Sequence, residues 1–267
     1  MPQHIDFDRL ERQQDELTRQ FRAGQPYEHV AIDGFLHQAS YQAVLRAIPA
    51  PVAGQKSSDY IFAKNKYENP QFDQSAAVLL ELRAELTSPR FSSFLTRLAG
   101  KPLFVDANFV GGGLHQGGPE SFLDMHADFS RHPAERLWVR EFNLLLYLNE
   151  PYDERWGGHL EMVHADTGQA GRVSPVGNRM VVMLTKGHTL HGYKPIAFPP
   201  GRYRTSIAAY AYSEDADFAA TPERSTLWKP SDAGVVKQGL AKVMPGLVKI
   251  KRAIAGSSTA KRAQRDK

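Results

Sequence analysis

The sequence has no cysteine among its 267 residues. Disulfides, thiolate nucleophiles and cysteine-bound zinc or iron–sulfur clusters are therefore excluded. A metal site in this chain must be built from histidine, aspartate or glutamate side chains.

The sequence also has no uninterrupted apolar run of about 20 residues, the length that a helix needs to cross a bilayer. The first residues, 1–20, are polar and acidic and lack the pattern of a signal peptide. We therefore expect a cytoplasmic protein. Hydrophobic residues make up 42% of the chain, which is enough for a substantial core.

Excess positive charge is confined to the C-terminal tail. Residues 229–267 carry ten Lys or Arg and two Asp, a net +8, whereas the whole chain has a net charge of +4. The first 228 residues therefore sum to −4, and we expect no nucleic-acid partner for them. A nucleic-acid or repair function would rest on the tail alone.

The tail has the pattern of a basic amphipathic helix. Apolar residues recur there in steps of four and three, at Val236, Leu240, Val243, Leu247, Ile250 and Ile254. Pro245 should kink or split this helix, and the polar end after Gly256 is expected to be disordered. Such a helix can contact an anionic membrane surface, pack on its own domain or form a dimer seam. The pattern favours self-packing or dimerisation over the membrane.

The first hundred residues are typical of helices. Spacing and turn signals predict a charged surface helix over residues 1–23, a short strand at 29–32, and helices at 36–48, 74–86 and 89–98. Gly100 has the usual position of a C-terminal glycine for the last helix.

From Pro102 the pattern changes to short β-branched and aromatic runs separated by Gly, Pro and Asn. The predicted strands are 103–110, 122–128, 139–148, 158–163, 180–184, 188–193 and 203–212. They are spaced as in a β-sandwich or barrel. We therefore predict an α+β fold in one domain, residues 1–228, with a helical layer at 1–100, a β core at 102–213, and a partly disordered tail at 229–267.

His126 and Asp128 lie in one predicted strand, where the two-residue period puts both side chains on one face. His191, on a later strand, supplies a second imidazole. Two imidazoles and one carboxylate suit Fe(II), because they leave three positions open for a bidentate 2-oxo acid and O2. Zinc hydrolases use similar ligands, so this triad alone does not decide the reaction.

His188 is an alternative to His191 as the distal ligand. It precedes His191 by three residues, and a strand cannot direct both side chains to one metal. Two other histidines, His159 and His164, are candidates by residue type, but their turn and loop positions favour surface residues.

Arg204 follows His191 by thirteen positions, and alternation directs Arg204 and Ser206 to the same face of a strand. A buried arginine needs an anion, and its planar fork matches a carboxylate. The distal carboxylate of 2-oxoglutarate is one candidate, and a structural salt bridge is the other.

Several motifs together resemble those of the 2-oxoglutarate and Fe(II)-dependent oxygenases, in particular the prolyl-4-hydroxylase-like branch. The strand 140–149 ends in Tyr-Leu-Asn, Gly157-Gly158 resembles the family's Gly-Gly turn, and Arg204 is followed by Ser206. The resemblance covers about residues 102–213. It implies a double-stranded β-helix, or jelly roll, with flanking helices.

The resemblance also implies a role for each matching residue. His126, Asp128 and His191 would hold iron, Arg204 would anchor 2-oxoglutarate, and Tyr147 would bind the same carboxylate, with Ser206 as a helper. A core tyrosine without such a role is the alternative for Tyr147. His115 and Gln116 lie in a fragment that resembles bacterial members, but no role is assigned to them.

The implied reaction is hydroxylation of an organic substrate with release of succinate and CO2. Fe(II) would be the cofactor, 2-oxoglutarate and O2 the co-substrates, and ascorbate an accessory reductant. Family halogenases have a non-liganding residue where this chain has Asp128, which favours hydroxylation. The alternative function is a non-catalytic, cupin-like metal-binding or sensor jelly roll, which would not need the anion-binding Arg204.

The substrate is less well defined. The resemblance implies a small molecule or a peptidyl group, with a prolyl or other amino-acid-type group as the natural first candidate. Substrate contacts are expected from segments 129–137 and 149–155 and their surroundings, for which the candidates are Arg131, His132, Arg136 and Trp138. Solvated loop residues are the alternative for all four. The substrate, the oligomeric state and the role of the tail stay open.

Overall fold

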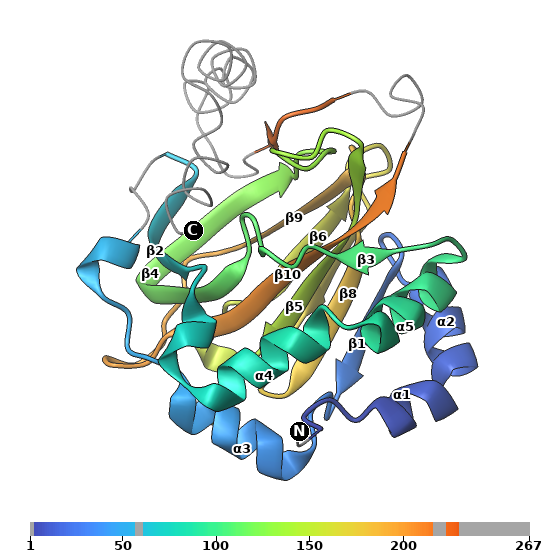
Figure 1. Cartoon of the computed structure of the whole chain (residues 1–267). Coiled ribbons are helices and arrows are strands. Elements are labelled where there is room, and N and C mark those ends of the chain that lie inside the picture. Colours follow the sequence, from blue (N-terminus) through green and yellow to red (C-terminus); the bar gives the residue numbers. More distant parts are fainter. Residues whose placement is uncertain (1–2, 57–60, 216–222, 230–267) are drawn as a thin grey trace.

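The computed structural model describes residues 3–56, 61–215 and 223–229. Helices and 3-10 turns occupy much of the first hundred residues, and antiparallel strands dominate from there on (Figure 1). The sheet curls into a nearly closed, jelly-roll-like barrel, so the predicted α+β fold class is confirmed. The basic tail from residue 230 onward lies outside the described residues.

The helices match the predicted spacing closely. Their bounds are α1 Phe7–Arg12, α2 Gln14–Ala23, α3 Gln38–Ala47, α4 Ala77–Leu86 and α5 Pro89–Ala99. The first predicted helix is divided at Gln13, and its apolar stripe is fully buried against the rest of the core. Helix α5 starts after Ser88, whose side chain accepts a hydrogen bond from Phe91 N, and ends at Gly100 in the left-handed conformation.

Eleven strands form one sheet within the described part of the chain. They are β1 His29–Asp33, β2 Ala63–Asn69, β3 Phe104–Val105, β4 Gly113–Ala127, β5 Trp138–Tyr147, β6 Leu160–His164, β7 Ala170–Val173, β8 Arg179–Leu184, β9 Thr189–Tyr193, β10 Arg204–Glu214 and β11 Leu227–Trp228. The main path runs β1-β8-β5-β10-β4-β9-β6-β7, with β2 and β11 on β4 and β3 on β10.

The prediction missed four parts of this sheet, one of which is the two-residue strand β11. Strand β2 is largely polar, β7 has four residues without a hydrophobic pattern, and the first half of β4 is rich in glycine. Both β1 and β2 lie within the predicted helical layer but pair with β8 and β4 of the barrel. Conversely, the strand predicted at 103–110 is reduced to two residues, because a turn follows Asp106.

Side-chain alternation divides β5 and β10 into two faces. Leu144 and Leu146 of β5 and Ile207 and Ala209 of β10 pack in the core that the helices cover. The opposite face of β10 carries Arg204, Ser206, Ala208 and Tyr210, which line a cavity inside the barrel. The helices therefore stabilise one side of the sheet and leave the other side free for chemistry.

None of the helices in the described ranges is long and apolar enough to cross a membrane.

Candidate active site

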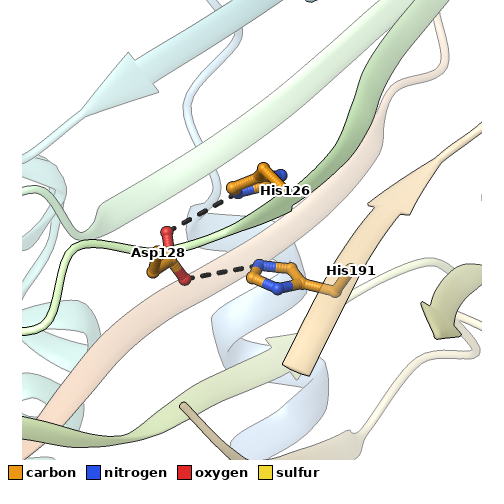
Figure 2. Close-up of side chains that lie close together, drawn as sticks. All are labelled: His126, Asp128 and His191. Carbon is orange, nitrogen blue, oxygen red and sulfur yellow. Dashed lines mark ion pairs between the residues drawn. The ribbon is translucent and has the colours of Figure 1, made fainter. Parts of the chain in front are cut away.

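Three candidate metal ligands meet inside the barrel (Figure 2). His126 lies at the end of β4, Asp128 directly follows that strand, and His191 lies in the middle of β9. Asp128 Oδ1 is 3.6 Å from His126 Nε2, and Asp128 Oδ2 is 3.4 Å from His191 Nε2. The structure therefore brings the three predicted residues together, with their ligand atoms within 4.8 Å of one another.

Hydrogen bonding orients His126 for metal binding. Its Nδ1 donates to the carbonyl of Asp124 at 2.9 Å, which leaves the lone pair of Nε2 directed toward Asp128. Burial and the nearby His126 together lower the pKa of His191 to about 3, although Asp128 acts to raise it. His191 is therefore a neutral imidazole at physiological pH, the form that a metal ion binds.

Two buried residues of β5 hold the carboxylate of Asp128. Arg140 Nη2 donates to Oδ2 at 3.1 Å and Asn143 Nδ2 donates to the same oxygen at 2.7 Å. Burial acts to raise the pKa of Asp128, but the charge of Arg140 outweighs it, with help from the histidines, and the pKa lies well below the usual range. Asp128 therefore stays ionised.

The site prediction did not include Arg140 or Asn143. Both are polar residues in a central strand that is mostly apolar, and this contrast was the sequence signal that could have identified them. Alternation would place residues three apart on opposite faces. The register shift opposite Ala211 and Tyr212 leaves Glu141 as an extra residue, and this bulge turns Arg140 and Asn143 to the same carboxylate.

Gly192, the residue after His191, allows β9 to approach β4 closely. A Cβ atom at Gly192 would lie 2.5 Å from Leu123 O and 2.9 Å from Asp124 C, both backbone atoms. Any side chain at this position would push apart the two strands that carry the histidines.

Arg204 lies deep in the same cavity. Its Nε donates to Gly158 O at 2.7 Å, its Nη2 donates to the Tyr147 hydroxyl at 3.1 Å, and its guanidinium lies over the Tyr193 ring at 4.2 Å. Arg204 is 8% exposed, and no carboxylate of the described residues pairs with it. The structural salt bridge that the sequence left open is therefore not found in this part of the chain.

The surroundings of Arg204 are built to hold an anion. Tyr147 is fully buried on β5, and Ser206 lies opposite it on β10. Burial raises the pKa of Tyr147 despite the nearby Arg204, so its hydroxyl stays protonated and able to donate. Arg204 and Ser206 line the cavity, and the Tyr147 hydroxyl lies 3.1 Å from Arg204 Nη2.

The cavity has a volume of about 550 Å³ and joins the histidine triad to Arg204. Apolar and aromatic residues such as Leu123, Phe129 and Trp228 line it together with the charged side chains of Lys66 and Glu68. This volume can hold 2-oxoglutarate and a small substrate or side chain at the same time.

The candidate substrate contacts from the loop segments lie elsewhere. Arg131 pairs with Asp215 at 2.8 Å, the buried His132 lies 3.3 Å from Asp106, and Trp138 packs against Phe104 and Tyr212. Neither these residues nor Arg136 is among the described side chains that line the cavity. Arg131, His132 and Trp138 instead brace the loop after Asp128, whereas Phe129 of the same predicted segment does line the cavity.

The other candidate histidines, His159, His164 and His188, lie outside the triad. His188 lies beside His164 rather than in the triad, with ring centroids 4.6 Å apart. His159 pairs with Glu154. His191 is therefore the histidine that meets His126 and Asp128.

The donor set fits Fe(II) and 2-oxoglutarate. Two imidazoles and one ionised carboxylate have ligand atoms within 4.8 Å of one another, which is the donor set of a non-haem iron site with open positions. The guanidinium of Arg204 lies in the same cavity without a carboxylate partner among the described residues, and its charge fits the far carboxylate of the co-substrate.

A comparison with models of protein families gives one match. Residues 112–212 match the 2OG-Fe(II) oxygenase superfamily. A comparison with the curated proteins finds no match.

Solved structures share the fold at low sequence identity. A prolyl 4-hydroxylase from Pseudomonas putida has 19% identity and a TM-score of 0.50, over 78% of this chain and 100% of the other. A prolyl hydroxylase from Trichoplax adhaerens, solved with a hypoxia-inducible-factor peptide, has 16% identity and a TM-score of 0.52, over 80% and 94%. A prolyl 4-hydroxylase from Phytophthora capsici has 17% identity and a TM-score of 0.55, over 100% and 92%.

Sequence, fold and donor set agree: residues 112–212 form a domain of the 2OG-Fe(II) oxygenase superfamily, and the chain is a 2-oxoglutarate-dependent dioxygenase with Fe(II) as its cofactor.

Proposed function

We propose that this enzyme hydroxylates an amino-acid-type group, free or within a peptide, with a prolyl ring as the first candidate. His126, Asp128 and His191 would bind Fe(II), and Arg204 with Tyr147 would bind the far carboxylate of 2-oxoglutarate. The observation that carries the proposal is the buried Arg204, which has no carboxylate partner among the described residues and lies in the same cavity as the histidine triad. A cupin-like sensor without oxygen chemistry would have no use for this charge.

When bound, iron and 2-oxoglutarate supply the oxidising power, and O2 provides one oxygen atom to the substrate and one to succinate. The protein contributes geometry. Arg140 and Asn143 fix the carboxylate of Asp128, and the Asp124 carbonyl fixes the ring of His126. Arg204 orients the co-substrate from the opposite end, and the buried position of the site limits the access of water.

Two buried polar atoms support a polar substrate. Arg140 Nη1 and His115 Nε2 have no hydrogen-bond partner within the described structure, and both residues line the cavity. Buried donors of this kind are costly unless a bound group satisfies them. The carbonyl or carboxylate of an amino acid is such a group.

The apolar part of the cavity suits an aliphatic ring beside these polar atoms. Trp228 stacks on the ring of His126 with centroids 4.8 Å apart and on Phe62 at 4.9 Å. Leu123 and Phe129 line the same cavity. A prolyl ring combines an apolar body with a neighbouring carbonyl, as these walls require.

The test is substrate-dependent turnover. The enzyme with Fe(II), 2-oxoglutarate and ascorbate is incubated with free L-proline, prolyl peptides, other amino acids and unrelated small molecules. Succinate formation and the mass of each product are measured. We expect an amino-acid-type substrate to stimulate succinate formation above background and to gain one oxygen atom. If only an unrelated small molecule is hydroxylated, the substrate proposal fails while the oxygenase assignment stands.

A further inference from the structure

The tripeptide His-Ala-Asp occurs twice in this chain, at residues 126–128 and again at residues 164–166. Both copies lie at the end of a strand, β4 for the first and β6 for the second. Each copy also meets a histidine from the neighbourhood of β9, which is His191 for the first copy and His188 for the second.

Backbone hydrogen bonds place the second cluster, which consists of His164, Asp166 and His188. His164 is the Cα partner of Thr189, the first residue of β9. The amide of Ala165 donates to the carbonyl of His188 at 2.8 Å. The turn after β6 is thereby fixed against the turn before β9.

The side chains of this cluster lie close together. One ligand atom from each of the three residues lies within 4.8 Å of the other two. The imidazole rings of His164 and His188 stack with an angle of 24° between their planes. The spacing is therefore short enough for one ion to reach all three groups.

The polar atoms of the second cluster are mostly uncommitted. The His188 ring and the Asp166 carboxylate have no hydrogen bond or ion pair to any residue that the structure describes. His164 Nδ1 accepts one long hydrogen bond, 3.3 Å, from Asp166 N. The two histidines are half-buried and Asp166 is exposed, so the cluster is open to solvent.

Burial and charges of both signs surround the ring of His188. Partial burial and the neighbouring His164 lower the pKa of His188, while Asp166 and Glu28 act to raise it. Lys186 is the nearby cation, and its ammonium pairs with Glu141 at 2.8 Å.

We propose that His164, Asp166 and His188 form a second divalent-metal site, separate from the iron site, that binds a late first-row ion such as Zn²⁺. Two nitrogens and one oxygen, completed by water, match the tetrahedral coordination of zinc. Zinc also binds such donors more tightly than Fe²⁺ does. The bound ion would clamp the β6–β7 turn to the start of β9, the strand that carries His191 three residues after His188.

The test compares how much Zn²⁺ the full-length, untagged apoprotein and its variants retain in equilibrium dialysis, with metal and protein measured in each sample. The key variant is His164→Ala/His188→Ala, whose side chains are partly exposed, so we expect it to fold. We expect this variant to bind one equivalent of Zn²⁺ less than the wild type, regardless of how much Zn²⁺ the site of His126, Asp128 and His191 retains. A matched control, His37→Ala, removes a half-exposed histidine from the N-terminal layer and should leave the stoichiometry unchanged.

A second pair of variants locates the ion. His126→Ala/His191→Ala should retain the equivalent that depends on His164 and His188, and replacing all four histidines should abolish it. Equal stoichiometry in the wild type and His164→Ala/His188→Ala would overturn the proposal. This outcome is independent of turnover, so the second site can fail while the proposed hydroxylation stands.

Discussion

Arg140 reaches the candidate iron site through Asp128: its Nη2 atom lies 3.1 Å from Oδ2 of that carboxylate. The guanidinium is also held by Asn143 Oδ1 and by the ring of Tyr210, whose centroid lies 3.4 Å from Arg140 Cζ. The charge of a fully buried arginine thus serves to orient and ionise one metal ligand.

Arg140→Lys tests this relationship. Lysine keeps the charge but loses the planar fork, so Asp128 and Asn143 should lose their fixed orientation. We expect Fe(II) affinity to fall roughly 10- to 100-fold, the usual effect of disturbing a group that orients a metal ligand. Anaerobic Fe(II) titration measures the affinity, and circular dichroism checks the fold. Unchanged affinity in a folded variant would show that Arg140 does not position the ligand.

Tyr147→Phe tests the anion site. The substitution removes the hydroxyl that contacts Arg204 and, in the proposal, the co-substrate carboxylate. Loss of one hydrogen bond of about 1 kcal/mol should raise the KM for 2-oxoglutarate roughly 5-fold with little change in the Fe(II) affinity. Steady-state kinetics with varied 2-oxoglutarate measures this change.

Tyr193→Phe is the matched control for Tyr147→Phe. It removes a hydroxyl that pairs with Ser121 but keeps the ring that lies over Arg204. We expect the KM for 2-oxoglutarate to stay near the wild-type value. An equal rise in both variants would mean that packing around Arg204, rather than the Tyr147 hydroxyl, sets the affinity.

Gly192→Ala tests the close approach of β9 to β4. The added methyl would collide with backbone atoms of Leu123 and Asp124, which cannot move aside as a side chain can. We expect a loss of about 1–3 kcal/mol in the free energy of unfolding, typical of overpacking, and weaker Fe(II) binding. Chemical denaturation measures the stability. Gly54→Ala, where no atom lies within 4 Å of the new methyl, is the control and should be close to neutral.

Glu141, which pairs with lysines and does not line the cavity, makes the free energy of unfolding depend on pH. Burial acts to raise its pKa, but hydrogen bonds from Lys101 and Lys186 outweigh this and lower the pKa in the folded state. The resulting stability is present above the unfolded pKa of glutamate, about 4.3, and is lost as the pH falls through the folded pKa. Urea unfolding should therefore show Glu141→Gln to be less stable than the wild type at pH 7, with a smaller difference in acid. A pH-independent difference would contradict this account.

The sequence carried enough information to predict most of the architecture and the triad. The apolar period of the N-terminal helices and the alternation in β10 both appear in the structure as predicted. His126 and His191, predicted as ligands of one metal, are direct Cα partners across β4 and β9.

The unpredicted features depend on long-range pairing. Strand β2 has little apolar pattern of its own and is stabilised by pairing with β4. The roles of Arg140 and Asn143 depend on a bulge that breaks the two-residue period of β5. The meeting of His164 with His188 depends on which turns lie side by side, and local spacing does not contain this information.

The central claim is that one cavity binds both Fe(II) and 2-oxoglutarate, through the triad and Arg204. The most direct measurement is an anaerobic titration of the apoprotein with Fe(II) and 2-oxoglutarate, monitored by the visible charge-transfer band of the ternary complex. We expect the band in the wild type, its loss in His191→Ala, and its loss or marked weakening in Arg204→Ala. A wild-type protein that binds iron but gives no band, or an Arg204→Ala variant with the full band at the same 2-oxoglutarate concentration, would contradict the assignment of this cavity.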